Sequence, residues 1–292
     1  MHRKVCWEEM FPDELRAAIA RRPVCYFAYG LCEPHGPQSA LGLDGHKAYG
    51  VVLAAARAHG GVVAPPTWWH ISEVPLGDAF WEGVLGPGWR EIGATFRTAL
   101  PPQLFYHQLL YHLRAAELAG CRVALLVTGH AGGLEVDMRM VVAAYCARRP
   151  LRAAAVVDAE LIRYRDYRGD HAGPCETSQL WALRPDLEDL GRLEGKRSRE
   201  GLFASSPTAA QASRREGERI VRSQVRSLKR LSDRLLAEAR SQPPAAWFPP
   251  EENEAIWEQV LAQQAQWVVT HPLTGFAEHA RAQAQRYPPA SW

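Results

Sequence analysis

The sequence predicts an α/β protein in which a mainly parallel sheet carries helices on both faces. The first observation is a set of four short apolar runs of strand length, at 24–28, 62–64, 123–127 and 153–157. The second is the helical spacing of apolar residues in segments between and around these runs. Strands that alternate with helices form βαβ units, and the strands of such units are parallel.

Apolar residues at helical spacing, and proline or glycine residues that stop a helix, mark several of the predicted helices. Phe11, Leu15 and Ile19 recur every four residues in a helix over 7–22, which Pro23 ends. Glycine closes two of the later helices, because it readily adopts the conformation that ends a helix. The later helices are predicted over 45–59, 104–120, 134–148 and 211–240.

Composition bounds the class of protein. The chain has 292 residues, 47% of them hydrophobic and 23% charged, with a net charge of +2, as expected of a globular protein in water. It shows neither a signal-peptide pattern nor an apolar run of membrane-spanning length, so we expect a cytoplasmic protein without a membrane partner. The six cysteines are scattered and contain no Cys-x-x-Cys pair, which predicts reduced thiols.

A polar loop follows the first predicted strand and holds candidate metal ligands. Residues 33–37 read Glu-Pro-His-Gly-Pro, a tight non-helical sequence, and Asp44 lies just beyond them. In open α/β sheets, ligands bind at the carboxyl ends of the strands. Carboxylate oxygens together with an imidazole nitrogen suit zinc, manganese or iron(II). A solvated turn is the alternative that these residues alone leave open.

Two more polar loops are expected at the same edge of the sheet. Residues 128–133, Thr-Gly-His-Ala-Gly-Gly, follow the third strand and contain His130. Residues 169–178 follow the fourth strand and contain His171 and Glu176. Because the carboxyl ends of parallel strands meet at one edge, we expect these loops to lie together.

The segment 67–102 is long, irregular and rich in aromatic residues. Its aromatic content argues against disorder, and long loops within compact domains are usually functional. We interpret Trp68, Trp69 and His70 as part of a pocket wall or a lid that binds the substrate. A contact between subunits is the alternative, because large exposed apolar patches mark interfaces.

The chain is predicted to divide into a main domain over 1–240 and a helical extension over 241–292, at a break that Gln242-Pro243-Pro244 makes. The long helix before this break has an apolar side and an Arg-rich side. Nucleic-acid binding is one interpretation of the Arg-rich side. The near-neutral net charge favours a solvated helix face instead, so we expect no nucleic-acid partner.

The three polar loops together resemble the creatininase (creatinine amidohydrolase) family. That family shows Glu-x-His-Gly with a following Asp, then a Gly-His turn, then Asp-His-Ala-Gly-x-x-Glu-Thr-Ser. This chain has Glu-Pro-His-Gly from residue 33 with Asp44 at the family's spacing, a Gly-His turn at 129–130, and the complete third block over 170–178. The resemblance covers about residues 7–240.

The resemblance implies a three-layer α/β/α fold with a dinuclear metal centre, in a homo-oligomer such as a hexamer. It implies two divalent ions per chain, zinc, manganese or iron, with Asp44 bridging them. It assigns His171 as the residue that transfers a proton during catalysis. The metal ligands that it implies are Glu33, His35, Asp44, His130 and Glu176.

Two departures from the family's pattern bear on the substrate. Creatininase carries a Glu two residues after the His of the Gly-His turn, where this chain has Gly132, and the family's second loop histidine, expected near Gln38, is absent. We therefore do not expect creatinine as the substrate. We expect a hydrolase whose metal-activated water attacks an amide or cyclic amide of a small molecule. The alternatives are a hydrolase of a ring ketone or a modified peptide, and a non-catalytic metal-binding or scaffold member.

Overall fold

The computed structural model of the protein describes residues 4–71, 97–131, 133–164, 170–193, 208–270 and 276–291. Its centre is a four-stranded sheet with the strand order β2-β1-β3-β4. Each pair of neighbouring strands in this sheet is parallel. The prediction of an α/β fold with a mainly parallel sheet is therefore confirmed. The strands are β1 (Val24–Tyr29), β2 (Val62–Val63), β3 (Val123–Thr128) and β4 (Arg152–Val157).

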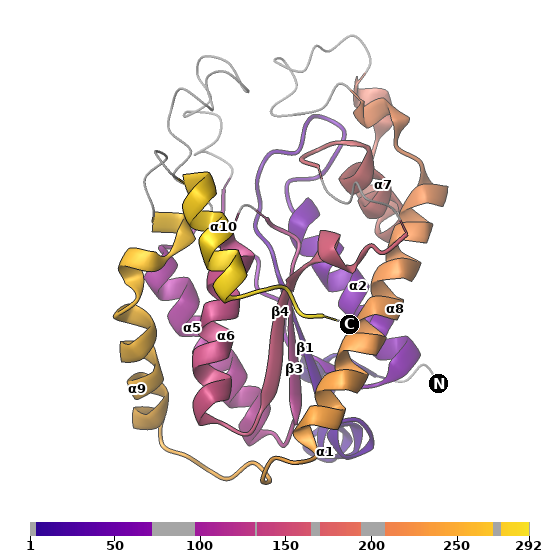
Figure 1. Ribbon diagram of the computed structural model, residues 1–292. Helices are drawn as coiled ribbons and strands as arrows, with labels where there is room; N and C mark the ends of the chain where they lie inside the picture. Colours follow the sequence, from indigo (N-terminus) through magenta and orange to yellow (C-terminus); the bar gives the residue numbers. More distant parts are fainter. Residues whose placement is uncertain are drawn as a thin grey trace.

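Both faces of the sheet are buried, which explains why its strands are continuous apolar runs. In β1, Phe27 and Tyr29 point into one core, while Val24 and Tyr26 point into the other. Helices cover both cores, so the predicted three layers are present (Figure 1). The helices on the first face are α1 (Pro12–Arg21), α5 (Pro102–Leu118) and α6 (Leu134–Arg148), and those on the second face are α2 (Leu43–His59) and α8 (Arg214–Ala239).

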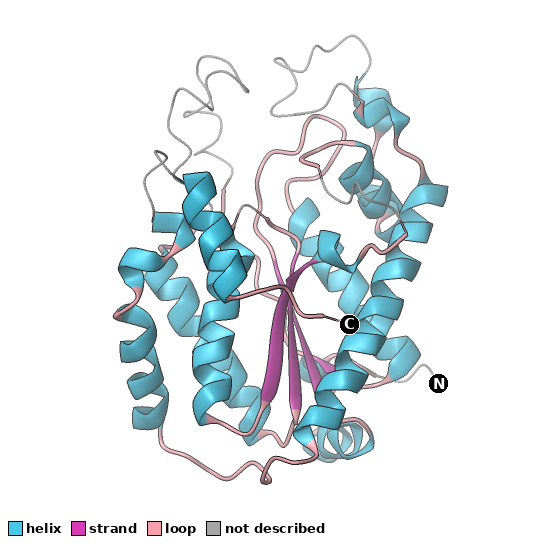
Figure 2. Ribbon diagram, in the orientation of Figure 1, coloured by secondary structure: helices cyan, strands magenta, loops and turns pink. Residues whose placement is uncertain are grey.

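The other elements, which are helix α7, the 3-10 turns and the helices after residue 240, lie outside the sheet (Figure 2). Helix α7 (Pro174–Leu183) packs against α2 and α8. No helix in the described part of the chain is long and apolar enough to span a bilayer. The 3-10 turns are Trp7–Glu9, Asp158–Leu161, Pro185–Leu187, Leu190–Leu193, Ala209–Gln211, Gln264–Gln266 and Val268–Thr270.

One difference between a predicted and an observed helix boundary matters for the site. Helix α2 begins at Leu43, whereas the sequence pattern predicts its start at Gly45. Asp44 therefore lies in the first turn of a helix, and a carboxylate there is favoured by the partial positive charge of the helix N-terminus. The backbone of Asp44 is thus held by helix α2 rather than by an irregular loop, which fixes the position of its side chain.

The chain after residue 240 packs closely onto the first helical layer. Helix α9 (Pro250–Leu261) contacts α5 and α6, and the Trp267 side chain is fully buried in the same core. The buried Asp137 carboxylate on α6 accepts hydrogen bonds from the backbone N–H groups of Val268 at 2.9 Å and Val269 at 3.2 Å. These contacts hold the extension against the domain, and its division from the domain at residue 240 stays a prediction.

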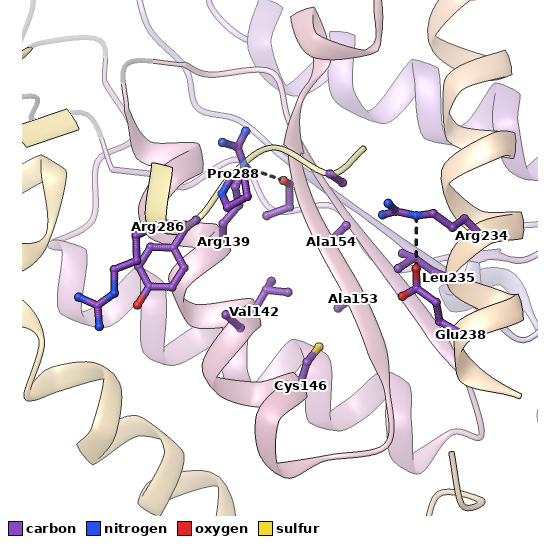
Figure 3. A pocket seen from close by; sticks show the side chains of 14 residues that line it. Arg139, Val142, Cys146, Ala153, Ala154, Arg234, Leu235, Glu238, Arg286 and Pro288 are labelled. Atoms are coloured by element: carbon purple, nitrogen blue, oxygen red, sulfur yellow. Dashed lines mark hydrogen bonds and ion pairs between the residues drawn. The ribbon is translucent and has the colours of Figure 1, made fainter. Parts of the chain in front are cut away.

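A cavity of about 310 Å³ lies beside the edge strand β4 (Figure 3). Side chains of α6 and α8 line it, and the chain that follows α10 (Phe276–Arg286) contributes Pro288 and Ala290. Its walls are largely apolar, with an ion pair between Arg234 Nε and Glu238 Oε1 at 3.5 Å. Its lining includes none of the predicted metal or catalytic residues, so it is separate from the candidate site described below.

Candidate metal centre

The candidate ligands meet where the strands end, because helix α2 begins in direct contact with the loops after β1 and β3. A Cβ atom on Gly30 would lie 2.3 Å from the backbone nitrogen of Gly45, and one on Gly129 would lie 2.1 Å from the backbone oxygen of Asp44. A larger residue at either glycine would push α2 away from the sheet. The two glycines thus place Asp44 between the two loops.

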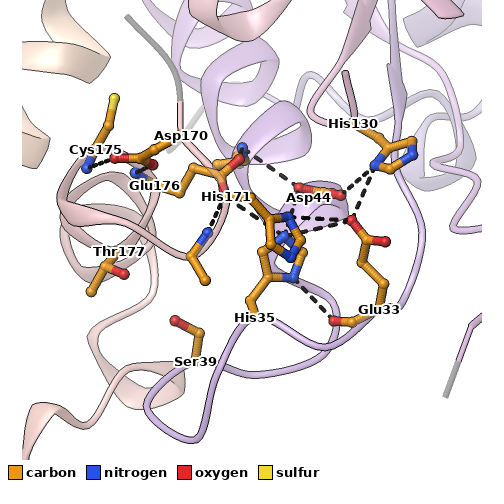
Figure 4. A network of polar contacts seen from close by, with 12 residues as sticks. Glu33, His35, Ser39, Asp44, His130, Asp170, His171, Cys175, Glu176 and Thr177 are labelled. Carbon is orange, nitrogen blue, oxygen red and sulfur yellow. Dashed lines mark hydrogen bonds and ion pairs between the residues drawn. The ribbon is translucent and has the colours of Figure 1, made fainter. Parts of the chain in front are cut away.

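Glu33, Asp44 and His130 form the tightest group of donor atoms (Figure 4). The Nδ1 atom of His130 lies 3.2 Å from Glu33 Oε1 and 3.1 Å from Asp44 Oδ2. Both carboxylate residues are buried, with 4% of Glu33 and 1% of Asp44 exposed. Two carboxylates and one imidazole around a common point form a donor set of the kind that binds zinc or manganese.

His35, Asp44 and Glu176 form a second group that shares Asp44 with the first. The Nε2 atom of His35 lies 3.4 Å from Asp44 Oδ1 and 3.7 Å from Glu176 Oε2. The Nδ1 atom of His35 lies 3.0 Å from the carbonyl oxygen of Glu33, which fixes the tautomer with the proton on Nδ1. The Nε2 atom then faces the carboxylates. The structure therefore brings all five predicted ligands together.

The loop before α7 is ordered by Asp170, and this loop positions Glu176. The Asp170 carboxylate accepts hydrogen bonds from the backbone N–H groups of Cys175 at 2.7 Å and Glu176 at 3.0 Å. Ala172 adopts a positive φ of 52°, and its N–H donates to Glu176 Oε2 at 2.9 Å. The Asp of the third motif is thus explained by loop geometry rather than by ligation.

Lys47 belongs to the site, although the sequence analysis did not identify it. It lies on α2 one turn after Asp44 and is 1% exposed. Its ammonium group forms an ion pair with Glu176 Oε1, and lies 3.5 Å from Asp44 Oδ1 and 3.8 Å from Asp158 Oδ2. The signal that would have found it is the three-residue spacing from Asp44, since residues three apart share one face of a helix.

The carboxylates of the centre give it a strong preference for positive charge. Burial alone would raise the pKa of Glu33, but His130 and His171 lower it to about 2. Burial alone would lower the pKa of His130, but Glu33 and Asp44 raise it to about 10. Asp44 similarly raises the pKa of the buried His35 to about 9. Without a metal ion both imidazoles are therefore protonated, and a metal ion that binds them must displace these protons.

His171 lies at the open side of the centre, with 38% of its side chain exposed. Its Nδ1 atom lies 3.8 Å from Glu33 Oε1, and its ring centroid lies 4.4 Å from that of His35. Its Nε2 atom lies 3.1 Å from the carbonyl oxygen of Pro34. Burial and the positive charge of His35 lower the pKa of His171. The role of His171 in proton transfer stays a prediction.

The two tryptophans predicted to bind substrate lie in different environments. The Trp68 ring packs over the start of α2, with its centroid 4.4 Å from the His46 ring. Trp69 is 52% exposed and extends from the same segment. Trp81 and Trp89, the further tryptophans of the segment predicted to form a pocket wall, lie outside the described residues.

His70, the third predicted substrate-binding residue, is fully buried. Its ring centroid lies 4.1 Å from that of Phe105 and 5.6 Å from that of His130, and its Nε2 atom lies 3.3 Å from Thr128 Oγ1. Burial and the neighbouring His130 lower its pKa to about 3, so His70 is neutral. The structure thus places it against a candidate ligand, and the predicted contact of these residues with a substrate stays a prediction.

The donor atoms fit a divalent cation. The buried Nε2 atom of His35 has no hydrogen-bond partner within the described part of the chain, although it faces the carboxylates of Glu33, Asp44 and Glu176. In the metal-free chain this nitrogen carries a proton, so the pocket already stabilises a positive charge among these carboxylates, as it would stabilise a divalent cation. Within each group, the donor atoms all lie within 4.8 Å of one another, close enough to share one ion.

Together the fold and the site define a three-layer α/β/α protein with a buried carboxylate–imidazole centre of the metal-binding type. The family model for creatininase, described as creatinine amidohydrolase, matches residues 8–232. The chain therefore belongs to the creatininase family. A comparison with curated proteins gives no match.

Solved structures of creatininase share the fold of this chain. A crystal structure of creatinine amidohydrolase (creatininase) matches with a TM-score of 0.60 and 20% identity, over 80% of this chain and 97% of the other. A structure described as creatininase Mn matches with a TM-score of 0.60 and 21% identity, over 80% and 98%. A mutant creatininase of the Zn-Zn type matches with a TM-score of 0.59 and 20% identity, over 80% and 98%.

Proposed function

We propose that this chain is a metal-dependent hydrolase that attacks the carbonyl carbon of an amide or cyclic amide in a small molecule. The observation that carries the proposal is the meeting of Glu33, Asp44 and His130 with His171 beside them. These residues come from three loops and one helix start that are far apart in the sequence. A solvated turn would not bury its carboxylates or direct separate imidazoles toward them.

The residues of the centre have distinct roles in this proposal. Glu33, Asp44 and His130 would hold the ion, which when bound acts as a Lewis acid and lowers the pKa of a water molecule. Glu33 also faces the His171 imidazole, so it orients this ring at the edge of the centre. His171 is partly exposed and has a lowered pKa, which makes its protonated form a good donor toward a departing nitrogen.

Zinc and manganese are the first metals to consider, followed by iron. Structures similar to this chain are described with manganese and as the Zn-Zn type. Two ions per chain would fill the two donor groups that contain Asp44, with Asp44 as the bridge between them. The second group, however, includes two carboxylates that the Lys47 ammonium already contacts or approaches closely.

A non-catalytic metal-binding or scaffold member is the second candidate. Gly132 favours it, because creatininase carries a Glu at that position of the Gly-His turn. Gly132 lies outside the described residues. Ring ketones and modified peptides are the alternative substrates for an active enzyme. An amide hydrolase, a hydrolase of a ring ketone or modified peptide, and a non-catalytic protein differ in turnover and in the bond that is broken. One panel of substrates therefore separates them.

The test is metal removal and restoration, followed by turnover of a panel of small amides, cyclic amides, ring ketones and modified peptides. We expect hydrolysis of an amide that stops after chelation and returns with zinc or manganese. His130→Ala should abolish it, while His107→Ala should not, because His107 pairs with Glu254 away from the centre. Bound metal without turnover of any compound would favour the non-catalytic candidate. A chain that takes up no metal would contradict both candidates.

We further propose a homo-oligomer, with a hexamer as the form that the family resemblance suggests. Trp69 and Trp247 are 52% and 75% exposed, which is unusual for tryptophan on a surface that contacts only water. Light scattering at micromolar concentration should give a mass several times that of one chain. A monomer at that concentration would contradict the proposal.

A further inference from the structure

Lys47 is a buried cation placed against the oxygens that the second donor group needs. Its ammonium contacts Glu176 Oε1, and the other oxygen of that carboxylate accepts the Ala172 N–H at 2.9 Å. Both oxygens of Glu176 therefore already have donors. The ammonium also lies 3.5 Å from Asp44 Oδ1, the oxygen that faces His35.

The two oxygens of Asp44 consequently face two different environments. Its Oδ2 atom lies 3.1 Å from His130 Nδ1, in the group that contains Glu33. Its Oδ1 atom lies between His35 Nε2 at 3.4 Å and the Lys47 ammonium at 3.5 Å. One side of the carboxylate is thus directed to a donor group that an ion can occupy, and the other side already faces a fixed positive charge.

The charges of the described residues balance with one divalent ion rather than two. Four buried carboxylates surround the centre, and among the described residues the Lys47 ammonium and the Arg97 guanidinium, 3.6 Å from Glu33 Oε2, offset two of them before any charge on the histidines is counted. At most two negative charges remain, which one divalent ion neutralises. A second divalent ion would make the buried centre positive beside the Lys47 ammonium, which is unfavourable where the local dielectric is low. The carboxylates are Glu33, Asp44, Asp158 and Glu176.

The Lys47 ammonium has little room to move away from an arriving ion. Its side chain is held on α2 and is 1% exposed. The cavity beside it, which Asp158 and Gln179 also line, measures about 40 Å³. That volume holds about one water molecule, and Asp158 and Glu176 line it, so an ammonium group that shifted into it would stay beside the same carboxylates. The Lys47 ammonium therefore stays beside Asp44 and Glu176, the carboxylates that a second ion would also need as ligands.

We propose that Lys47 takes the place of a second metal ion, so that the chain binds one divalent ion, at Glu33, Asp44 and His130. This inference rests on the proposed metal-dependent function and changes the number of ions that the sequence resemblance implies. Lys47 acts as a positioning residue, because it holds Asp44 and Glu176 without contacting the proposed ion itself. His35 and Glu176 then line the centre as second neighbours of the ion.

The stoichiometry of the stripped and reloaded full chain tests the proposal. Elemental analysis after gel filtration, and calorimetric titration with zinc and with manganese, should give one ion per chain. Electron paramagnetic resonance of the manganese form should show an isolated ion without coupling to a second. This spectrum needs no variant, so it tests the proposal even where substitutions in the centre fail to fold.

Substitutions should move the stoichiometry in opposite directions. Lys47→Met removes the charge and keeps the length of the side chain, so it should raise the number of ions to two and produce a coupled manganese spectrum. Lys47→Arg keeps the charge and should hold the number at one. Lys229→Met, a matched change at an exposed lysine, should leave one ion. His35→Ala should keep the single ion, while His130→Ala should lose it.

The outcomes distinguish a failure of the proposed role of Lys47 from a failure of the proposed metal-dependent hydrolase function. Two ions in the wild-type chain, or one ion in a folded Lys47→Met variant, would overturn the role of Lys47 and leave a metal-dependent hydrolase intact. A single ion that His35→Ala removes and His130→Ala does not would also overturn it. A wild-type chain that binds no zinc or manganese would instead overturn the proposed function together with the inference.

Discussion

The pKa of a buried carboxylic acid is shifted in opposite directions at two sites in this molecule. At the ends of the strands, Glu33 lies against imidazoles and its pKa falls to about 2. On α6, Asp137 accepts hydrogen bonds from two backbone N–H groups and from the Tyr106 hydroxyl at 2.8 Å, and burial raises its pKa to about 7. The first carboxylate faces positive charge, and the second is held by neutral donors.

The difference shows that the groups around a buried carboxylate, rather than its burial, distinguish a ligand site from a structural anchor. A carboxylate among neutral donors is stabilised in place, but its charge is not compensated, so its affinity for a proton increases. Carboxylates that converge on imidazoles stay ionised and attract a cation. Buried acids alone would therefore be weak evidence for a metal site. The direction in which their pKa values move, together with the donors around them, makes the distinction.

The largest effect should come from removing the residue that both donor groups share. Asp44→Ala should abolish metal binding and turnover, because it deletes one oxygen ligand from each group. Asp137→Ala should instead keep the metal. It should lower the free energy of unfolding by about 1–3 kcal/mol for each buried donor that loses Asp137 as its hydrogen-bond acceptor. Elemental analysis and denaturant unfolding of both variants check the contrast. Metal loss in Asp137→Ala would break it.

The fold was predictable because its signals are local. The apolar runs at 24–28 and 123–127 are buried on both faces, and they correspond to β1 and β3 almost residue for residue. The five candidate ligands were identified by the resemblance of three motifs to those of the creatininase family, and their meeting was predictable because parallel strands end at one edge. These signals required no knowledge of which side chains touch.

Lys47 and Asp137 escaped prediction for a physical reason. The sequence shows each as one charged residue within an otherwise ordinary helix, and charged residues on helices are usually solvated. Only packing brings Lys47 to Asp158, which follows β4, and Asp137 to Val268 in the extension. Long-range contacts of this kind leave no periodic pattern in the sequence. The start of α2 at Leu43 escaped prediction because the close approach at Gly129 is also a tertiary contact.

A smaller effect should come from His171, which lies beside the ligands. His171→Ala should retain the metal and slow turnover by about 10²–10⁴-fold, the usual contribution of general acid–base catalysis. This corresponds to about 3–5 kcal/mol of activation free energy. Metal content and turnover must be measured on the same preparation, once a substrate is found. Parallel loss of metal and activity would make His171 a ligand or an anchor of its loop.

The smallest effect concerns the pH dependence of the anchor. The pKa of Asp137 is about 7 in the folded chain, and that of an unfolded Asp is about 3.9. Between these values the folded state binds the proton more tightly than the unfolded state does. The Asp137 contribution to the free energy of unfolding should therefore fall as the pH rises from about 4 to about 7, by on the order of a few kcal/mol.

Asp137→Asn isolates this contribution, because the amide does not ionise. The free energy of unfolding of the wild type minus that of Asp137→Asn should decrease from pH 5 to pH 8, measured by denaturant titration at several pH values. Asp233→Asn is the control, since Lys229 and Arg22 lower the pKa of Asp233 despite partial burial, and its difference from the wild type should stay flat above pH 5. A flat profile for Asp137→Asn would mean that Asp137 is ionised in the folded chain at pH 5. The neutral donors around it would then compensate its charge as well as imidazoles compensate that of Glu33, and the contrast between the two acidic sites would disappear.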